Sequence, residues 1–131
     1  NFMDQHQAHT VLGGAYQFMG LITRPDVIAQ NPSLVQRMSN AIVKANRFIG
    51  AQPGPAIAQL IPEALQVGGD PALLGEILDQ FKGHLYPTDG RIRLEDVARV
   101  IDAQRSSGQL PAASGPEPSL LFTNEFVDRS R

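Results

Sequence analysis

Few residues in this sequence are of a type and spacing that could do chemistry. His6 and His9 lie near Asp4, and two imidazoles with one carboxylate could in principle hold a metal ion. The spacing matches no established zinc pattern, and no Glu stands beside either histidine in a helical arrangement. We therefore interpret the segment as a solvated loop and expect no metal site.

Motifs for nucleotide binding, calcium binding and nucleophilic catalysis are also missing from the sequence. Gly13 and Gly14 are not part of a GxGxxG or Walker sequence, and no lysine follows where a P-loop requires one. Asp89 and Gly90 lack the alternating oxygen ligands of an EF-hand, so a turn is the favoured interpretation. No GxSxG or SxxK context nominates a nucleophile, and the chain has no cysteine. The sequence predicts a protein that is not an enzyme.

Some charged and aromatic side chains could still contact a ligand, but each has a simpler explanation. Glu76 and Asp79 lie three residues apart on one expected helix, a spacing that suits a solvated face. Arg24 could pair with an anionic group, although an exposed arginine at the end of a strand is more frequent. Tyr16 and Phe18 could line an apolar pocket, although aromatics that alternate along a strand usually belong to a core.

The composition favours one globular domain and excludes several partners. The chain has 131 residues, of which 42% are hydrophobic and 18% charged, and its net charge is −2. Lysines and arginines are scattered singly, so no basic stripe is present that would neutralise nucleic-acid phosphates or anionic lipids. No apolar run approaches roughly 18 residues, and no signal peptide is visible.

The periodicity of the apolar residues predicts a mostly α fold with one or two strands. Residues 11–23 alternate between two faces and are the best strand candidate, weakened by Gly20. Pro25 suits the first turn of a short helical stretch. The strongest element is a helix over residues 32–49, where apolar residues repeat at three and four, with Asn31 as N-cap and Gly50 as C-cap.

Three further helices, a turn and a tail are expected downstream. Pro55 and Pro71 each stand just inside the start of a helix, over residues 55–61 and 71–81, and residues 95–104 form another. Residues 87–90 have turn chemistry. The expected organisation is a crossover and strand segment over 1–24, a helical body over 25–109, a linker over 110–119 and a docking tail over 120–131. In the tail, Thr123 or Asn124 caps a final short helix.

Short motifs follow one another along nearly the whole chain in an order typical of one family. They are LGGAYQF at 12–18, PDVI at 25–28, NP at 31–32, VQR at 35–37, NA at 40–41, PAIA at 55–58, LIP at 60–62, GD at 69–70, YPTDG at 86–90 and TNEFV at 123–127. In this order they resemble the C-terminal portion of the nitrate, sulfonate and taurine-type periplasmic substrate-binding proteins of ABC importers. The motifs are caps, turns and hydrophobic steps, so the resemblance depends on their collinearity.

The resemblance implies a fold, a function and a location. In that family two α/β lobes of the periplasmic-binding fold flank a ligand cleft, and this chain corresponds to the C-terminal segment that returns to complete the first lobe. It implies capture of a small anionic or aromatic ligand without catalysis or cofactor, and an ABC membrane permease as partner. It also implies a periplasmic or membrane-anchored extracytoplasmic location, and it places Gly14 and Tyr16 near the cleft.

The resemblance predicts self-association of the chain taken alone, and an alternative function is also open. Helices shaped to cover a sheet supplied by earlier residues expose their apolar faces when the sheet is missing, which predicts a homodimer or an exchanged element. The alternative function is a free-standing helical protein–protein interaction domain, which binds its partner through the groove beside the helix over residues 32–49.

Overall fold

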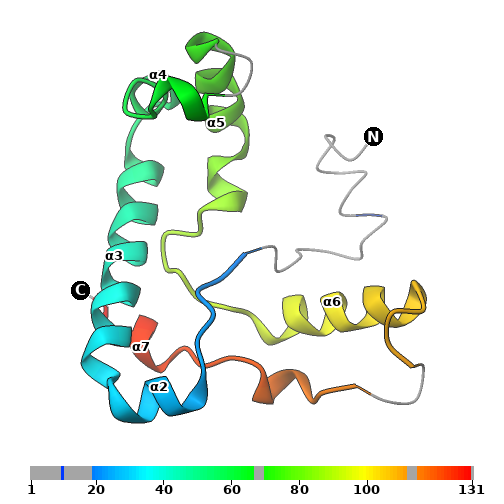
Figure 1. The fold of residues 1–131 in the computed structure, drawn as a ribbon. Coiled ribbons are helices and arrows are strands. Elements are labelled where there is room, and N and C mark those ends of the chain that lie inside the picture. The colour runs from blue at the N-terminus through cyan, green and yellow to red at the C-terminus, as the bar shows by residue number, and fades with distance from the viewer. Residues whose placement is uncertain (1–9, 11–18, 67–69, 112–114, 131) are drawn as a thin grey trace. The chain divides into compact units, whose positions relative to one another are not determined.

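The structure is a computed structural model that describes residue 10 and residues 19–66, 70–111 and 115–130. Its elements, drawn in Figure 1, are α2 (Pro25–Gln30), α3 (Pro32–Ala51), α4 (Gly54–Ala58), η1 (Glu63–Leu65), α5 (Pro71–Leu85), α6 (Leu94–Ser106), η3 (Pro118–Leu120) and α7 (Glu125–Asp128). No strand occurs in these ranges. The mostly helical class predicted by the sequence is confirmed, and the two-lobed periplasmic-binding fold stays a prediction.

The chain divides into two compact units. The first unit comprises Asn1–Ile22 and Ile92–Asn124 and contains α6 and η3. The second unit comprises Thr23–Arg91 and Glu125–Arg131 and contains α2, α3, α4, η1, α5 and α7. The short C-terminal segment therefore belongs with helices that precede it by many residues.

The predicted strand over residues 11–23 is wrong in the part that the structure describes. Residues 11–18 lie outside the described ranges, and residues 19–23 have no regular secondary structure. Met19, Leu21 and Ile22 are exposed. A strand is stabilised by pairing with a neighbour, and the described residues contain no second strand that could pair with this one.

Prolines begin the helices of the second unit, as the sequence predicts. Each of α2, α3, α4 and α5 has a proline in its first turn, where the missing N–H costs no hydrogen bond. Asp70 caps α5, because its Oδ1 accepts hydrogen bonds from the backbone N–H groups of Ala72 (2.9 Å) and Leu73 (3.2 Å). α4 ends at Ala58, earlier than predicted, and α5 extends to Leu85.

The ends of α3 differ from the predicted caps. Asn31 makes no side-chain capping hydrogen bond, and the helix runs through Gly50 to Ala51. Gly50 serves packing instead, because a Cβ at this position would lie 2.8 Å from Cγ2 of Thr88.

α4 and α5 cross at two glycines. A Cβ on Gly54 would lie 2.0 Å from the carbonyl oxygen of Gly75, and a Cβ on Gly75 would lie 2.9 Å from Cα of Pro55. Real Cβ atoms do not approach other atoms so closely, so the crossing requires glycine on both helices. The close approach forms the core cluster of Ile57, Ala58 and Leu78.

The predicted turn over residues 87–90 is present and packs against the middle of α3. The N–H of Gly90 donates to the carbonyl of Pro87 at 2.9 Å, and Gly90 has a φ of +64°. A Cβ there would lie 2.8 Å from Cγ2 of Val43, which is only 1% exposed. Both the positive φ and the lack of space therefore require glycine.

The last residues of the chain pack against α3. Phe126 of α7 is buried, and Nε2 of Gln36 donates to the Phe126 carbonyl at 2.8 Å. Arg91, just after the turn, forms an ion pair with Asp128 of α7. These contacts join α3, the turn and α7 within the second unit.

The first unit is held by α6 and by one asparagine. α6 buries Val97 and Ile101 and packs against η3. Asn124, expected as a helix cap, bonds both backbone groups of Ile92: its Oδ1 accepts from the N–H at 3.0 Å and its Nδ2 donates to the carbonyl at 2.9 Å. Ile92 and Asn124 are the first and last residues of this segment, so the side chain closes it.

Exchange of glycine for alanine should have opposite effects at two positions of α5. We expect Gly75→Ala to lower the free energy of unfolding by about 1–3 kcal/mol, because the new methyl group meets the backbone of α4. Gly83→Ala, at a position with no atom within 4 Å of the added Cβ, should raise it by about 0.5–1 kcal/mol through helix propensity. Urea denaturation measures both. Equal effects of the two substitutions would contradict the crossing described above.

Asn124→Ala should destabilise the protein by roughly 1–3 kcal/mol, since it leaves two backbone groups of Ile92 without their partner. The matched control is Asn46→Ala, which removes one exposed hydrogen bond to the Pro87 carbonyl. We expect the control to cost less than about 1 kcal/mol in the same urea titration. A larger loss for the Asn46 variant would count against the closing role of Asn124.

Candidate functional site

Most residues that the sequence nominates for chemistry lie outside the described ranges. This holds for Asp4, His6, His9, Gly14 and Tyr16. In the part of the chain that is described, no group of three or more His, Asp or Glu side chains is placed to hold a metal ion. The ligand-binding role of Gly14 and Tyr16 stays a prediction of the resemblance.

Arg24 is engaged locally. Its guanidinium donates Nε and one terminal nitrogen to the two carboxylate oxygens of Asp26, at 2.9 and 2.7 Å. Both side chains are exposed, so the pair adds little to stability. Asp26 would compete with an anionic ligand for this guanidinium.

Asp79 of α5 is a carboxylate with partners on two helices. Its Oδ1 accepts from Nζ of Lys82 at 2.8 Å and from the N–H of Gly54 at 2.8 Å. Lys82 also donates to the carbonyl of Gln52 at 2.6 Å. The hydrogen bond from Lys82, and after it the bond from Gly54, hold the pKa of Asp79 below its ordinary value.

This network joins α4 to α5 and does not suit acid–base catalysis. Gly54 is the first residue of α4, so its N–H has no partner within that helix, and Asp79 of α5 supplies one. A general acid at neutral pH needs a raised carboxyl pKa, whereas that of Asp79 is lowered. The spacing of Glu76 and Asp79 therefore does not mark a catalytic pair.

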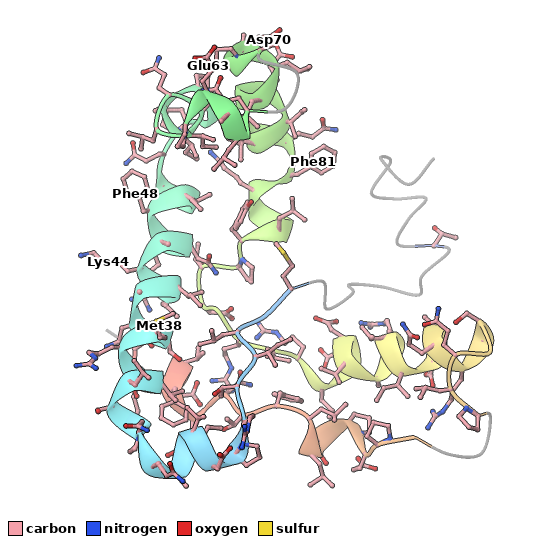
Figure 2. All side chains as sticks on the ribbon, in the orientation of Figure 1. Met38, Lys44, Phe48, Glu63, Asp70 and Phe81 are labelled. Atoms are coloured by element: carbon pink, nitrogen blue, oxygen red, sulfur yellow. The ribbon has the colours of Figure 1, made fainter. Side chains whose placement is uncertain are left out.

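A different surface stands out on α3. The helix buries Val35, Ser39 and Val43 on its inner side. Apart from Ile49, which packs against the core cluster, the other large apolar residues are 38–47% exposed. Together with two exposed alanines they form what we call the outer face of α3: Leu34, Met38, Ala41, Ile42, Ala45 and Phe48. In Figure 2 the labelled Phe48 projects from α3 on the same side as Lys44.

The sequence analysis identified one repeat at three and four in the helix over residues 32–49 and did not separate a buried row from an exposed one. Positions 35, 39 and 43 follow a row about 100° around the helix from positions 34, 38 and 42. Apolar residues thus occupy about half of the circumference, which is more than one packing face needs. The width of this arc was the available signal.

Three cations lie on α3, and none of its residues is acidic. Arg37 and Lys44 are seven residues apart and share one row of the helix, directly beside the row that contains Ala41 and Phe48. Arg47 shares a different row with Asn40, further from the outer face. The outer face is therefore an apolar surface with positive charge along one border.

None of the described helices combines the length and the apolar character that crossing a membrane requires. Compared with models of known protein families, with curated proteins and with solved structures, the chain has no significant match in any of the three. Inference about function therefore depends on the residues described above and on the collinear motifs.

The Asp79 network should make stability depend on pH in the acidic range. Because the folded-state pKa of Asp79 is lowered, its contribution is fully present above the ordinary value of 3.8 and is lost as the pH falls through the folded-state value. Asp79→Asn should therefore be less stable than the parent at pH 7, and the difference should shrink as the pH falls below 3.8. Glu76→Gln, on the same helix, is the matched control, because Glu76 takes no part in the network. Parallel urea titrations across this pH range decide the matter.

Proposed function

We propose that this chain is the C-terminal portion of a solute-binding protein of an ABC importer, which captures a small ligand and performs no reaction. The observation that carries the proposal is the amount of apolar surface left uncovered. The core of the described residues holds eight buried hydrophobic residues, whereas the large hydrophobic residues that are exposed outnumber them: Met19, Leu21, Ile22, Leu34, Met38, Ile42, Phe48, Leu60, Leu65, Leu73, Leu85, Leu94, Leu120 and Leu121.

Uncovered apolar surface on this scale is unusual for a chain that folds and acts alone. It occurs in both units: on α3 and α5 of the second, and at α6, η3 and residues 19–22 of the first. A helical layer that packs on a sheet from earlier parts of a larger polypeptide has such surfaces by design. Apart from those on the outer face of α3, the exposed residues are what this proposal expects of the chain taken alone.

The motifs behind the family resemblance have structural roles that support the proposal. In YPTDG, Gly90 packs on Val43, and Oδ1 of Asp89 accepts from the N–H of Arg91 at 3.0 Å. In TNEFV, Asn124 bonds Ile92 and Phe126 is buried. In this chain the two motifs therefore serve the fold, by placing a turn against α3 and by fixing the end of a segment.

Capture in such a protein works by differential binding. A ligand that contacts both lobes favours the closed form by the extra affinity it has for that form. The ligand would be anionic or aromatic, Gly14 and Tyr16 would lie near it, and the loaded protein would dock on the membrane permease outside the cytoplasm.

A thermal-shift panel on the complete gene product tests the proposal. The panel contains a sulfonate, nitrate, a pyrimidine precursor and an aromatic acid. A ligand at about 100 times its Kd should stabilise the folded state by roughly 2.7 kcal/mol, seen as a rise in Tm of a few degrees. Glycerol at the same concentration is the control. No shift with any of the four classes would reject capture as the function.

The second candidate is a helical protein–protein interaction domain that uses α3. The observation that favours it is the outer face of α3, where apolar side chains and cations lie together. The two candidates differ in the panel above, because an interaction domain gains no stability from any of the four small molecules.

A further inference from the structure

The outer face of α3 has the residue spacing of a helix-docking surface. Leu34, Met38, Ala41, Ala45 and Phe48 are separated by four and three residues alternately. This interval presents a straight apolar row to a second helix that lies along the first. The alanines in the middle permit close approach of the two backbones, and the larger side chains flank them.

The charges of α3 are the second observation. Six described lysines and arginines form ion pairs with carboxylates: Arg24, Lys82, Arg91, Arg99, Arg105 and Arg129. The side chains of Arg37, Lys44 and Arg47 form neither an ion pair nor a hydrogen bond with any residue that the structure describes. These three cations thus lie on the helix with the open apolar row.

We propose that the outer face of α3 docks an amphipathic helix of a partner protein, whose carboxylates flank its own apolar row and face Arg37 and Lys44. Charge complementarity favours this partner over a second copy of the chain or a membrane surface. A helix covers the apolar row and leaves both cations at the rim, where they meet carboxylates without losing much of their hydration.

Two other occupants fit the observations less well. A second copy of α3 would bring its own cations to the same border, and the helix has no acidic residue to meet them. A membrane surface favours helices with a large apolar face that includes bulky aromatics, whereas the middle of this row consists of alanines. The inference goes beyond ligand capture and stands on α3 alone.

The test measures binding of two labelled model peptides to the chain by fluorescence anisotropy. Both are helices of about 21 residues, or three heptads, with the same leucine row; one carries glutamates beside the row and the other lysines. At low salt we expect the glutamate peptide to bind at least tenfold more tightly. In roughly 1 M NaCl this preference should fall severalfold, because the screening length is then only about 3 Å.

Charge reversal on α3 separates docking from loss of folding. Arg37→Glu with Lys44→Glu should reverse the preference, so that the lysine peptide binds more tightly, and an unfolded protein could not produce such a reversal. Arg47→Glu changes the same charge on the same helix in another row and should leave the preference within about twofold. Met38→Glu should weaken binding of both peptides at least tenfold, since it places a charge in the apolar row.

Several results would overturn the proposal. Equal binding of the two peptides removes charge complementarity as its basis. Binding to vesicles that contain anionic phospholipid, without binding of the glutamate peptide, assigns the face to a membrane. A dimer that Met38→Glu converts to a monomer, again without peptide binding, assigns it to a second copy. The thermal-shift panel measures none of these properties, so any of these results would leave the capture proposal unaffected.

Discussion

The second unit depends on the contact between Gly90 and Val43. The positive φ of Gly90 and the lack of room for a Cβ let the turn over residues 87–90 reach the middle of α3, where Val43 is almost completely buried. From there Arg91 pairs with Asp128, and α7 lies against α3 so that Gln36 holds the carbonyl of Phe126. One backbone approach thus joins a long helix, a turn and the end of the chain, although these segments are far apart in sequence.

The sequence predicted features that local chemistry decides and missed those that depend on distant residues. Proline in the first turn of α2, α3, α4 and α5, and the turn that ends at Gly90, need only their neighbours, and they were predicted correctly. Gly50 was interpreted as a cap, yet its small size serves the packing of Thr88. Asn124 was also interpreted as a cap, yet its amide bonds Ile92. Residues 19–23 have the alternation of a strand but no described strand beside them, because pairing is a tertiary property that alternation does not supply.

The uncovered apolar surface links fold to function. Burial of apolar area is the main favourable term in folding, and a chain of this length can usually bury about two thirds of the surface that it exposes when unfolded. Here α5 keeps Leu73 and Leu85 exposed even though Gly54 and Gly75 bring α4 and α5 as close together as backbones allow. Tighter packing within the unit cannot cover these side chains. Under the proposed function, other residues of a larger polypeptide cover these side chains, and the helices form one layer of its fold.

The outer face of α3 sets a condition on what can cover it. A broad sheet that covered this face would extend past the row of Ala41 and Phe48 and would bury Arg37 and Lys44. Removal of a cation from water costs roughly several kcal/mol unless a carboxylate accompanies it. This cost does not arise where a cation near the exposed apolar residues already has a carboxylate partner. On α5, for example, Lys82 pairs with Asp79. A narrow partner that contributes its own carboxylates avoids the cost at α3, whereas an apolar sheet suits α5. The two helices of one unit are therefore suited to different neighbours, and a protein that both captures a solute and docks on another protein needs both kinds of surface.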